Sequence, residues 1–254
     1  MPPWPILPVK VNEEAEDVMM NLETLSIGEA IEDSENPGGG ILFLDGPIID
    51  PPHRIPQLSK SIPDDYLTQR VGSIESAIKK KISVIGIVKR IYGNLFIKHY
   101  SENLENAEKE KFTRMSSDKN LLVYTLTKYL RTKRDCLAIS KEVRQDTDIA
   151  DKYHDAGIDV YSFVLKNGYS SPPIRIDLPV LADEELKSDQ LENAIKSVVA
   201  WSAPRKQIPV PVLLAHEKCN IKQGAADVLY NEFMTRLWAT DNEDDVMVFL
   251  QNSD

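Results

Sequence analysis

Hydrophobic and polar residues follow a helical rhythm over several long segments of the chain. Between residues 11 and 32, apolar residues from Val18 to Ile31 recur at helical spacing with acidic residues between them, a pattern typical of an amphipathic helix. Helices are also predicted over residues 64–80, 121–130 and 183–200, and from about His216 towards Trp238. The pattern therefore predicts helices distributed along most of the chain.

Short, continuous apolar runs between these helices predict β-strands. Residues 41–44 are all apolar and lie between turn residues, which predicts a strand buried on both faces. Residues 83–88 predict a second strand. Residues 159–166 and 174–177 are predicted to be a pair of strands joined by Asn167-Gly168 and Pro172-Pro173. Strands mixed with helices in this way predict an α/β or α+β domain around a mixed sheet.

The composition is that of a folded protein without membrane-spanning segments. The chain has 254 residues, of which 42% are hydrophobic, enough to bury a sizeable core. It contains no run of eighteen or more apolar residues, and its first residues lack the pattern of a signal peptide. A cytoplasmic location without membrane association is therefore expected.

Two cofactor classes lack their usual sequence signals. The two cysteines, Cys136 and Cys219, are too few for a disulfide framework and lack the paired spacing of a zinc site. The three glycines at residues 38–40 precede a predicted strand, whereas a phosphate-binding loop follows a strand and opens a helix. The sequence therefore predicts no dinucleotide or P-loop site.

Charge is distributed unevenly along the chain. The formal net charge is −10, yet residues 79–134 contain fourteen Lys or Arg against five Asp or Glu. Such a basic segment in an acidic protein can localise a polyanion to one face. Lysines also commonly decorate solvated helix faces, and on the charge pattern alone this second interpretation is favoured.

Two residues at the ends of apolar segments are candidates for chemistry. Asp45 follows the first predicted strand, at the kind of sheet edge where open α/β sheets place ligands, although Asp-Gly is also a common turn dipeptide. His216 follows an apolar stretch and is expected to open a helix, where it could bind metal or phosphate or be structural. Taken alone, each residue fits an ordinary structural role.

Four segments carry motifs whose order and spacing are informative. Residues 41–49 form an apolar strand that runs into Asp45-Gly46-Pro47, and residues 84–90 form a strand with a central Gly and a terminal Lys-Arg. Residues 174–179 read Ile-Arg-Ile-Asp-Leu-Pro, and residues 209–216 are a Pro-rich approach to an Ala-His pair. In this order and spacing, the segments resemble the NurA family of archaeal DNA-end-processing nucleases, over about residues 23–233.

The resemblance implies a fold, an activity and partners. A ribonuclease H-like fold is expected, an α/β architecture with a mixed β-sheet flanked by helices, as a single NurA-like domain over residues 1–254. Family members cut DNA with manganese, with magnesium as the alternative ion. They act with the hexameric helicase HerA in the processing of broken DNA ends and in double-strand-break repair. DNA, a HerA-type helicase and a second copy of the chain in a homodimer are thus the expected partners.

The resemblance also implies a set of catalytic and metal-binding residues. Asp45 matches the Asp of the family's Asp-Gly-Pro motif, and His216 matches the family's histidine. Glu29, on the helix before Asp45, corresponds to the family's upstream glutamate, and Glu32 is the competing choice. Asp45, Glu29 and His216 are therefore expected to meet in one pocket around a divalent ion.

This set of residue types suits hydrolysis of a phosphodiester. Carboxylate oxygens are the ligands that hard divalent cations prefer, and two such ions can activate water and stabilise charge on the scissile phosphate. Lys89 and Arg90, directly after the second predicted strand, are the expected nucleic-acid contacts.

Two features of the family pattern are missing or changed. The family begins with a strand carrying Asp-Gly-Ser, whose Asp binds metal, and the chain starts too late to contain it. The family's tyrosine is replaced by Ile208, which cannot donate a hydrogen bond. Glu13, Glu14, Glu16 and Asp17 could supply carboxylates, or could form an exposed helix face.

Two hypotheses follow from the matches and the departures. In the first, the chain is a manganese- or magnesium-dependent DNA nuclease. In the second, it is a catalytically degenerate paralogue that binds DNA or a helicase. Only the family analogy supports either activity at this stage.

Overall fold

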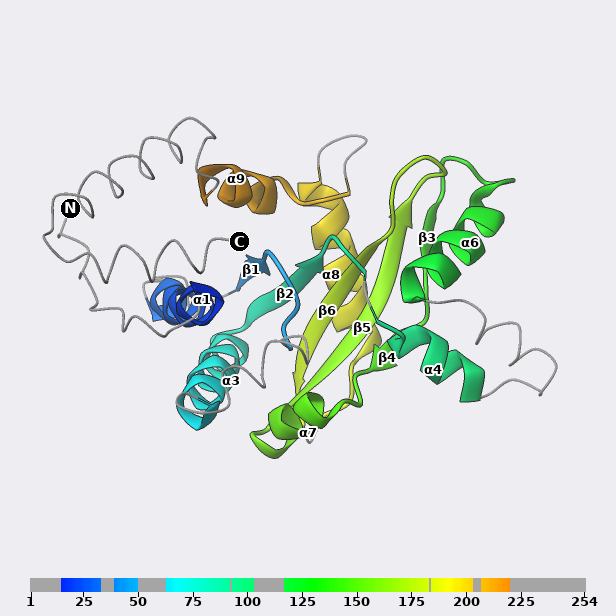
Figure 1. The fold of residues 1–254 in the computed structure, drawn as a ribbon. Helices are drawn as coiled ribbons and strands as arrows, with labels where there is room; N and C mark the ends of the chain where they lie inside the picture. Colours follow the sequence, from blue (N-terminus) through cyan, green and yellow to red (C-terminus); the bar gives the residue numbers. More distant parts are fainter. Residues whose placement is uncertain are drawn as a thin grey trace, which may run out of the picture. The chain divides into compact units, whose positions relative to one another are not determined.

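The computed structural model of the chain describes residues 15–32, 39–49, 63–91, 93–102, 117–182, 184–202 and 207–219. They form a central β-sheet with helices on both faces (Figure 1). The chain divides into two compact units, residues 1–212 and 213–254, and the sheet lies in the first. The single domain expected over residues 1–254 stays a prediction.

Helices and strands alternate along most of the described chain (Figure 1). The strands are β1 (Gly40–Leu44), β2 (Ile82–Val88), β3 (Leu137–Ile139), β4 (Val143–Arg144), β5 (Ile158–Asn167) and β6 (Ile174–Leu181). The helices are α1 (Ala15–Glu32), α3 (Pro63–Lys79), α4 (Leu95–Glu102), α6 (Asp118–Leu130), α7 (Asp148–Asp155), α8 (Ser188–Trp201) and α9 (Val210–Cys219).

The six strands form one mixed sheet in the order β1-β2-β6-β5-β3, and β4 also pairs with β5. Strands β1 and β2 are parallel, whereas all the other pairings are antiparallel. This arrangement confirms the predicted α/β class with a mixed sheet flanked by helices. It also confirms the predicted hairpin, since β5 and β6 pair along eight residues of β6. The ribonuclease H-like grouping stays a prediction.

The prediction that the first strand is buried on both faces is wrong. Strand β1 is the edge strand of the sheet, and Ile41 is 41% exposed while Leu44 is 4% exposed. A continuous apolar run is equally compatible with an edge strand that only helices cover in part, because hydropathy does not report neighbours.

Four predicted helices are confirmed, as α1, α3, α6 and α8. The predicted start of the last helix, near His216, is wrong, because α9 begins at Val210 and includes the Pro-rich stretch. Pro211 fits there because the first turn of a helix has no N–H partner to lose. The later part of that predicted helix, residues 220–238, lies outside the described residues.

Helices cover both faces of the sheet, and the two-residue alternation of β5 shows which residues face which side. Val160 packs in a cluster with α1, α3 and α7, and Val164 packs in a cluster with α4 and α6. Phe163 and Leu165 point the other way, into a cluster with α8 and Val212 of α9. This alternation follows from strand geometry.

Buried polar groups fix the start of α4 against α6. The Asp118 carboxylate accepts hydrogen bonds from the backbone N–H groups of Phe96 (3.1 Å) and Ile97 (2.9 Å), which have no partner within the first turn of α4. Burial raises the pKa of the Asp118 carboxyl, and these two hydrogen bonds oppose the rise. Leu130, at the other end of α6, is fully buried, so both ends of the helix are anchored.

Candidate active site

A carboxylate and an ammonium group meet where the two parallel strands end. Asp45 directly follows β1 and Lys89 directly follows β2, and Leu44 is registered with Gly86, so both side chains extend from the same end of the sheet. Lys89 Nζ lies 2.7 Å from Asp45 Oδ1 and 2.8 Å from Oδ2. The side chains are 25% and 33% exposed. The pair is therefore accessible to a ligand.

The chain after Asp45 crosses β2 at a glycine. A Cβ on Gly86 would lie 3.0 Å from the carbonyl oxygen of Gly46 and 3.1 Å from the Ile48 side chain. Such separations are shorter than ordinary contacts, so only glycine lets the loop lie this close to the strand. Gly86 thus determines the path of the chain that begins at Asp45.

Buried side chains hold both polar groups of Ile48 in this loop. Its N–H donates to Asp177 Oδ2 at 3.4 Å, and its carbonyl accepts from the Tyr153 hydroxyl at 3.3 Å. Asp177 lies on β6, and Tyr153 lies on α7. The loop is therefore tied to two different elements of the core just beyond Asp45.

Asp177 is a fully buried carboxylate with both oxygens occupied. Oδ1 accepts from Ser162 Oγ at 2.7 Å and from Arg175 Nε at 2.9 Å, and Oδ2 accepts from Arg175 Nη2 at 3.0 Å. Ser162, Asp177 and Gly86 are registered in one row across β5, β6 and β2. With its hydrogen bonds satisfied inside the protein, Asp177 supports the loop and is not available to a ligand.

Sequence reasoning assigned no role to Asp177 or Tyr153. The signals that could have found Asp177 are an Asp inside a mostly apolar strand and a glycine in the middle of another, which marks close backbone approach; Tyr153 carries no such signal. Neither signal tells which strands are neighbours, so the connection to Asp45 appears only in the folded chain.

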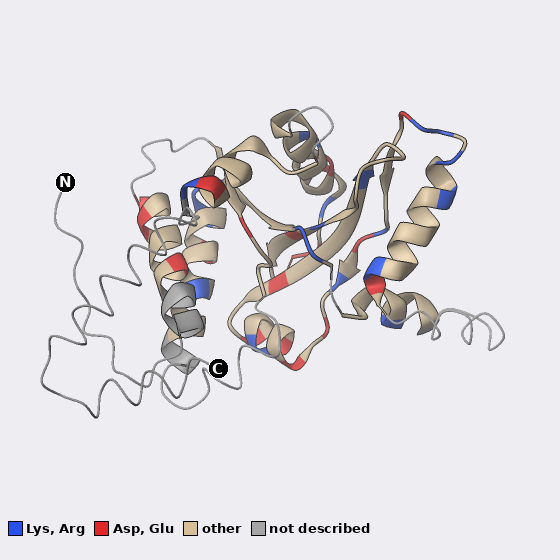
Figure 2. Ribbon diagram, turned by 45° about the horizontal axis from the view of Figure 1, so that its top comes forward, with Lys and Arg blue, Asp and Glu red and all other residues tan. Residues whose placement is uncertain are grey.

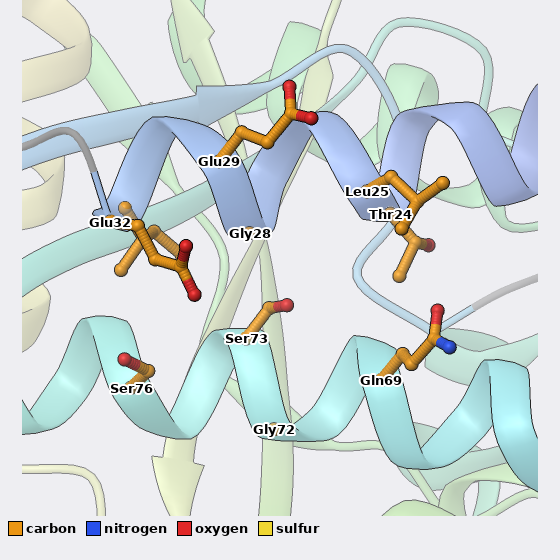
Figure 3. A pocket seen from close by; sticks show the side chains of 10 residues that line it. Thr24, Leu25, Gly28, Glu29, Glu32, Gln69, Gly72, Ser73 and Ser76 are labelled. Atoms are coloured by element: carbon orange, nitrogen blue, oxygen red, sulfur yellow. The ribbon is translucent and has the colours of Figure 1, made fainter. Parts of the chain in front are cut away.

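The two glutamates predicted as alternatives both lie on the exposed side of α1. Ile27 and Ile31 of this helix are buried in the core, whereas Glu29 and Glu32 are exposed. Both line a pocket of about 390 Å³ between α1 and α3, together with small residues such as Gly28. Figure 3 shows Glu32 turned towards α3 and Glu29 turned away from it. The two side chains therefore point to different sides of α1.

The remaining predicted site residues lie in different surroundings. Arg90 is exposed directly after Lys89. His216 lies within α9 in the second compact unit and is exposed there. Ile208, which the sequence resemblance matches to the family's tyrosine, is half-buried against the cluster around α8. It therefore serves as an apolar packing residue.

The donor chemistry fits a divalent ion in part. Asp45 offers an accessible carboxylate at a rigid position, which suits a hard cation. Within the part of the chain that the structure describes, no three His, Cys, Asp or Glu side chains are grouped closely enough to hold a metal ion. The meeting of Asp45, Glu29 and His216 around one ion stays a prediction.

Comparisons with known proteins define first a class and then a family. The fold is similar to the crystal structure of the NurA nuclease from Sulfolobus solfataricus, with a TM-score of 0.54, 13% identity, and coverage of 91% of this chain and 70% of that one. At this identity the likeness shows the fold. The family model of the NurA domain matches residues 7–221. The chain therefore belongs to the NurA family.

One further comparison found no match, and the described helices contain no membrane span. A search of curated protein sequences gives no match to the chain. None of the described helices is long and apolar enough to cross a membrane.

Proposed function

We propose that the chain is a metal-dependent DNA nuclease of the NurA type, with Asp45 as a catalytic metal ligand. The observation that carries the proposal is the Asp45–Lys89 pair, held by a core-anchored loop at the end of two parallel strands within a NurA domain. A preorganised carboxylate of this kind meets the demand for precise placement in catalysis.

The roles of the side chains follow from their charges. A bound manganese or magnesium ion supplies an activated water and neutralises charge on the phosphate. Asp45, Glu29 and His216 are the proposed ligands, with Glu32 as the alternative to Glu29. Lys89 Nζ neutralises Asp45 in the resting protein and contacts a phosphate when DNA is present, because an ammonium is a mobile point charge on a flexible stem. Arg90 adds a second phosphate contact.

A second candidate function is that of a catalytically degenerate DNA-binding paralogue. Two observations favour it. Lys89 contacts both oxygens of Asp45, so a metal ion at Asp45 would have to share the carboxylate with this ammonium or displace it. Ile208 packs against the core and offers no hydroxyl at the position of the family's tyrosine. In this case the Asp45–Lys89 pair has a structural role and DNA is bound without turnover.

The proposed partners are a HerA-type hexameric helicase and a second copy of this chain. The proposed process is the processing of DNA ends in double-strand-break repair. Family membership supports these proposals. Co-elution of the chain with a HerA-type helicase in size-exclusion chromatography, and the molar mass of the chain alone, test them; a monomer that never co-elutes contradicts both.

Cleavage of labelled single- and double-stranded DNA, with and without manganese, tests the nuclease proposal. We expect manganese-dependent cleavage that Asp45→Asn abolishes, because the amide keeps the shape and removes the charge. Asp146→Asn is the matched control, since Asp146 forms another Asp–Lys ion pair, with Lys98 at 2.7 Å, at an exposed position. Binding of DNA without cleavage by the wild-type chain refutes the nuclease and supports the paralogue.

A further inference from the structure

Two exposed tyrosines each lie beside a basic side chain at the end of α6. Tyr129 is 52% exposed and Tyr169 is 39% exposed. Lys133 Nζ lies 5.0 Å from the centre of the Tyr129 ring, and Arg134 Cζ lies 5.6 Å from the centre of the Tyr169 ring. We call these four residues the tyrosine platform. Each pair has the geometry of a cation–π contact.

The platform is held in place by backbone hydrogen bonds. Tyr169 N–H donates to the carbonyl of Arg134 at 3.0 Å, and Lys133 N–H donates to the carbonyl of Leu130 at 3.1 Å. Gly168 adopts a φ of 78°, and a Cβ there would lie 3.2 Å from the Arg134 carbonyl oxygen. The turn between β5 and β6 is therefore fixed against the chain that follows α6, the helix that carries Tyr129.

Positive charge surrounds the platform. Residues 117–136 contain five basic side chains, all exposed, while of the two acidic residues Asp118 is buried and Asp135 is exposed. Figure 2 shows the basic residues on α6 and on the loop after it. The helix dipole favours cations in the last turn of α6, but it does not account for two aromatic rings kept in solvent. Rings interleaved with cations are typical of surfaces that bind single-stranded nucleic acids.

Strand directions put the platform at the same end of the sheet as Asp45 and Lys89. Strand β6 is antiparallel to β2, and Val88 is registered with Arg175 near the start of β6. The β5–β6 turn therefore lies at the end where β2 finishes. Only β6 lies between β2 and β5, and neighbouring strands are about 5 Å apart, so β2 and β5 lie roughly 10 Å apart across the sheet. Tyr169 and the Asp45–Lys89 pair therefore extend from the same end of one sheet.

We propose that the tyrosine platform binds the single-stranded part of a DNA substrate by stacking bases on Tyr129 and Tyr169. Lys133 and Arg134 contact the adjacent phosphates. The inference rests on the proposed action on DNA and adds to it a binding surface separate from Asp45. Stacking tolerates any base because every base has a π-face, so the platform accepts single strands of any sequence.

Fluorescence anisotropy of labelled oligothymidylate with the full chain, in EDTA so that no cleavage occurs, tests the proposal. We expect Tyr129→Ala and Tyr169→Ala each to weaken binding about tenfold. The corresponding Phe variants keep the ring and should bind like the wild type. Tyr124→Ala is the matched control, because Tyr124 is 58% exposed on the same helix but five positions away, and so on a different side.

The salt dependence of oligothymidylate binding gives a second readout, which a merely structural role of Lys133 and Arg134 would not change. Lys133→Ala and Arg134→Ala should each reduce the slope of log affinity against log salt by about 0.7. Circular dichroism of every variant checks that it is folded.

Three outcomes overturn the platform. In the first, the Ala variants bind oligothymidylate as tightly as the wild type. In the second, the Phe variants bind as weakly as the Ala variants. In the third, the Ala variants lose as much affinity for a blunt duplex as for oligothymidylate. Ring-dependent binding without manganese-dependent cleavage refutes the nuclease proposal and supports the platform. Cleavage by the Ala variants with an unchanged KM supports the nuclease proposal and refutes the platform.

Discussion

Two carboxylate–cation pairs of similar geometry differ in burial and in the number of hydrogen bonds that they accept. Asp177 is fully buried and accepts hydrogen bonds from Arg175 and Ser162 and from the Ile48 N–H. Asp45 is one-third exposed and faces Lys89 at a surface of the protein. Both aspartates follow an apolar residue, but Asp45 stands after the end of β1 and before Gly46-Pro47, whereas Asp177 lies inside β6.

This difference identifies which of the two carboxylates can bind a ligand. A buried ion pair with satisfied hydrogen bonds cannot exchange its partner without leaving a charge uncompensated. A partly exposed ion pair contributes little to stability and can be opened by a competing cation or anion. Asp177 therefore organises the loop, and Asp45, carried by that loop, is the group available for chemistry.

The largest expected effect is the loss of stability when the buried pair is broken. Asp177→Ala leaves Arg175 without its carboxylate and the Ile48 N–H without its acceptor. The free energy of unfolding should fall by about 3–5 kcal/mol, measured by urea denaturation. The double variant Asp177→Ala/Arg175→Met should be less destabilised than the single variant. If the unfolding free energy of Asp177→Ala lies within about 1 kcal/mol of the wild type, which is the contribution of a surface ion pair, the structural role of Asp177 is contradicted.

The next effect comes from the close approach of the loop to β2. Gly86→Ala places a Cβ 3.0 Å from the Gly46 carbonyl oxygen and should lower the unfolding free energy by about 1–3 kcal/mol. Gly72→Ala is the matched control: it lies inside α3 with nothing within 4 Å. It should raise stability by about 0.5–1 kcal/mol, because Ala favours the helix. Opposite signs for the two variants are the expected result, and equal signs argue against the packing.

The smallest effect is expected at the exposed pair. Asp45→Ala and Lys89→Ala should each change the unfolding free energy by less than about 1 kcal/mol, because the pair is partly solvated. The same urea denaturation curves measure this. A loss for Asp45→Ala as large as that for Asp177→Ala removes the distinction between the two carboxylates and makes Asp45 a structural residue as well.

The elements that sequence patterns predicted best are those with strong local signals. Helix α3 and the β5–β6 hairpin lie close to their expected positions, because amphipathic spacing and turn residues act within a short stretch of chain. The short strands β3 and β4 and the helix α7 were not predicted. Their few residues carry no period, and pairing with β5 stabilises the two strands.

The candidate site divides in the same way. The motif around Asp45, the central Gly86 and the terminal Lys89 could be recognised in the sequence as family features. The contacts that hold this loop, from Asp177 and Tyr153, join residues more than one hundred positions apart. No local pattern encodes such a pairing, so they could not be assigned from the sequence.

The sequence by itself determined the family, the helical and extended segments, the basic middle of the chain and the presence of an Asp at the end of a strand. These properties depend on residue identity and spacing over short distances. Tertiary structure alone decided that β1 is an edge strand, that Asp177 is buried and Asp45 accessible, and that Tyr169 of the β5–β6 turn lies beside Arg134. Burial and strand order depend on which distant segments pack together, and that choice is made by the whole fold.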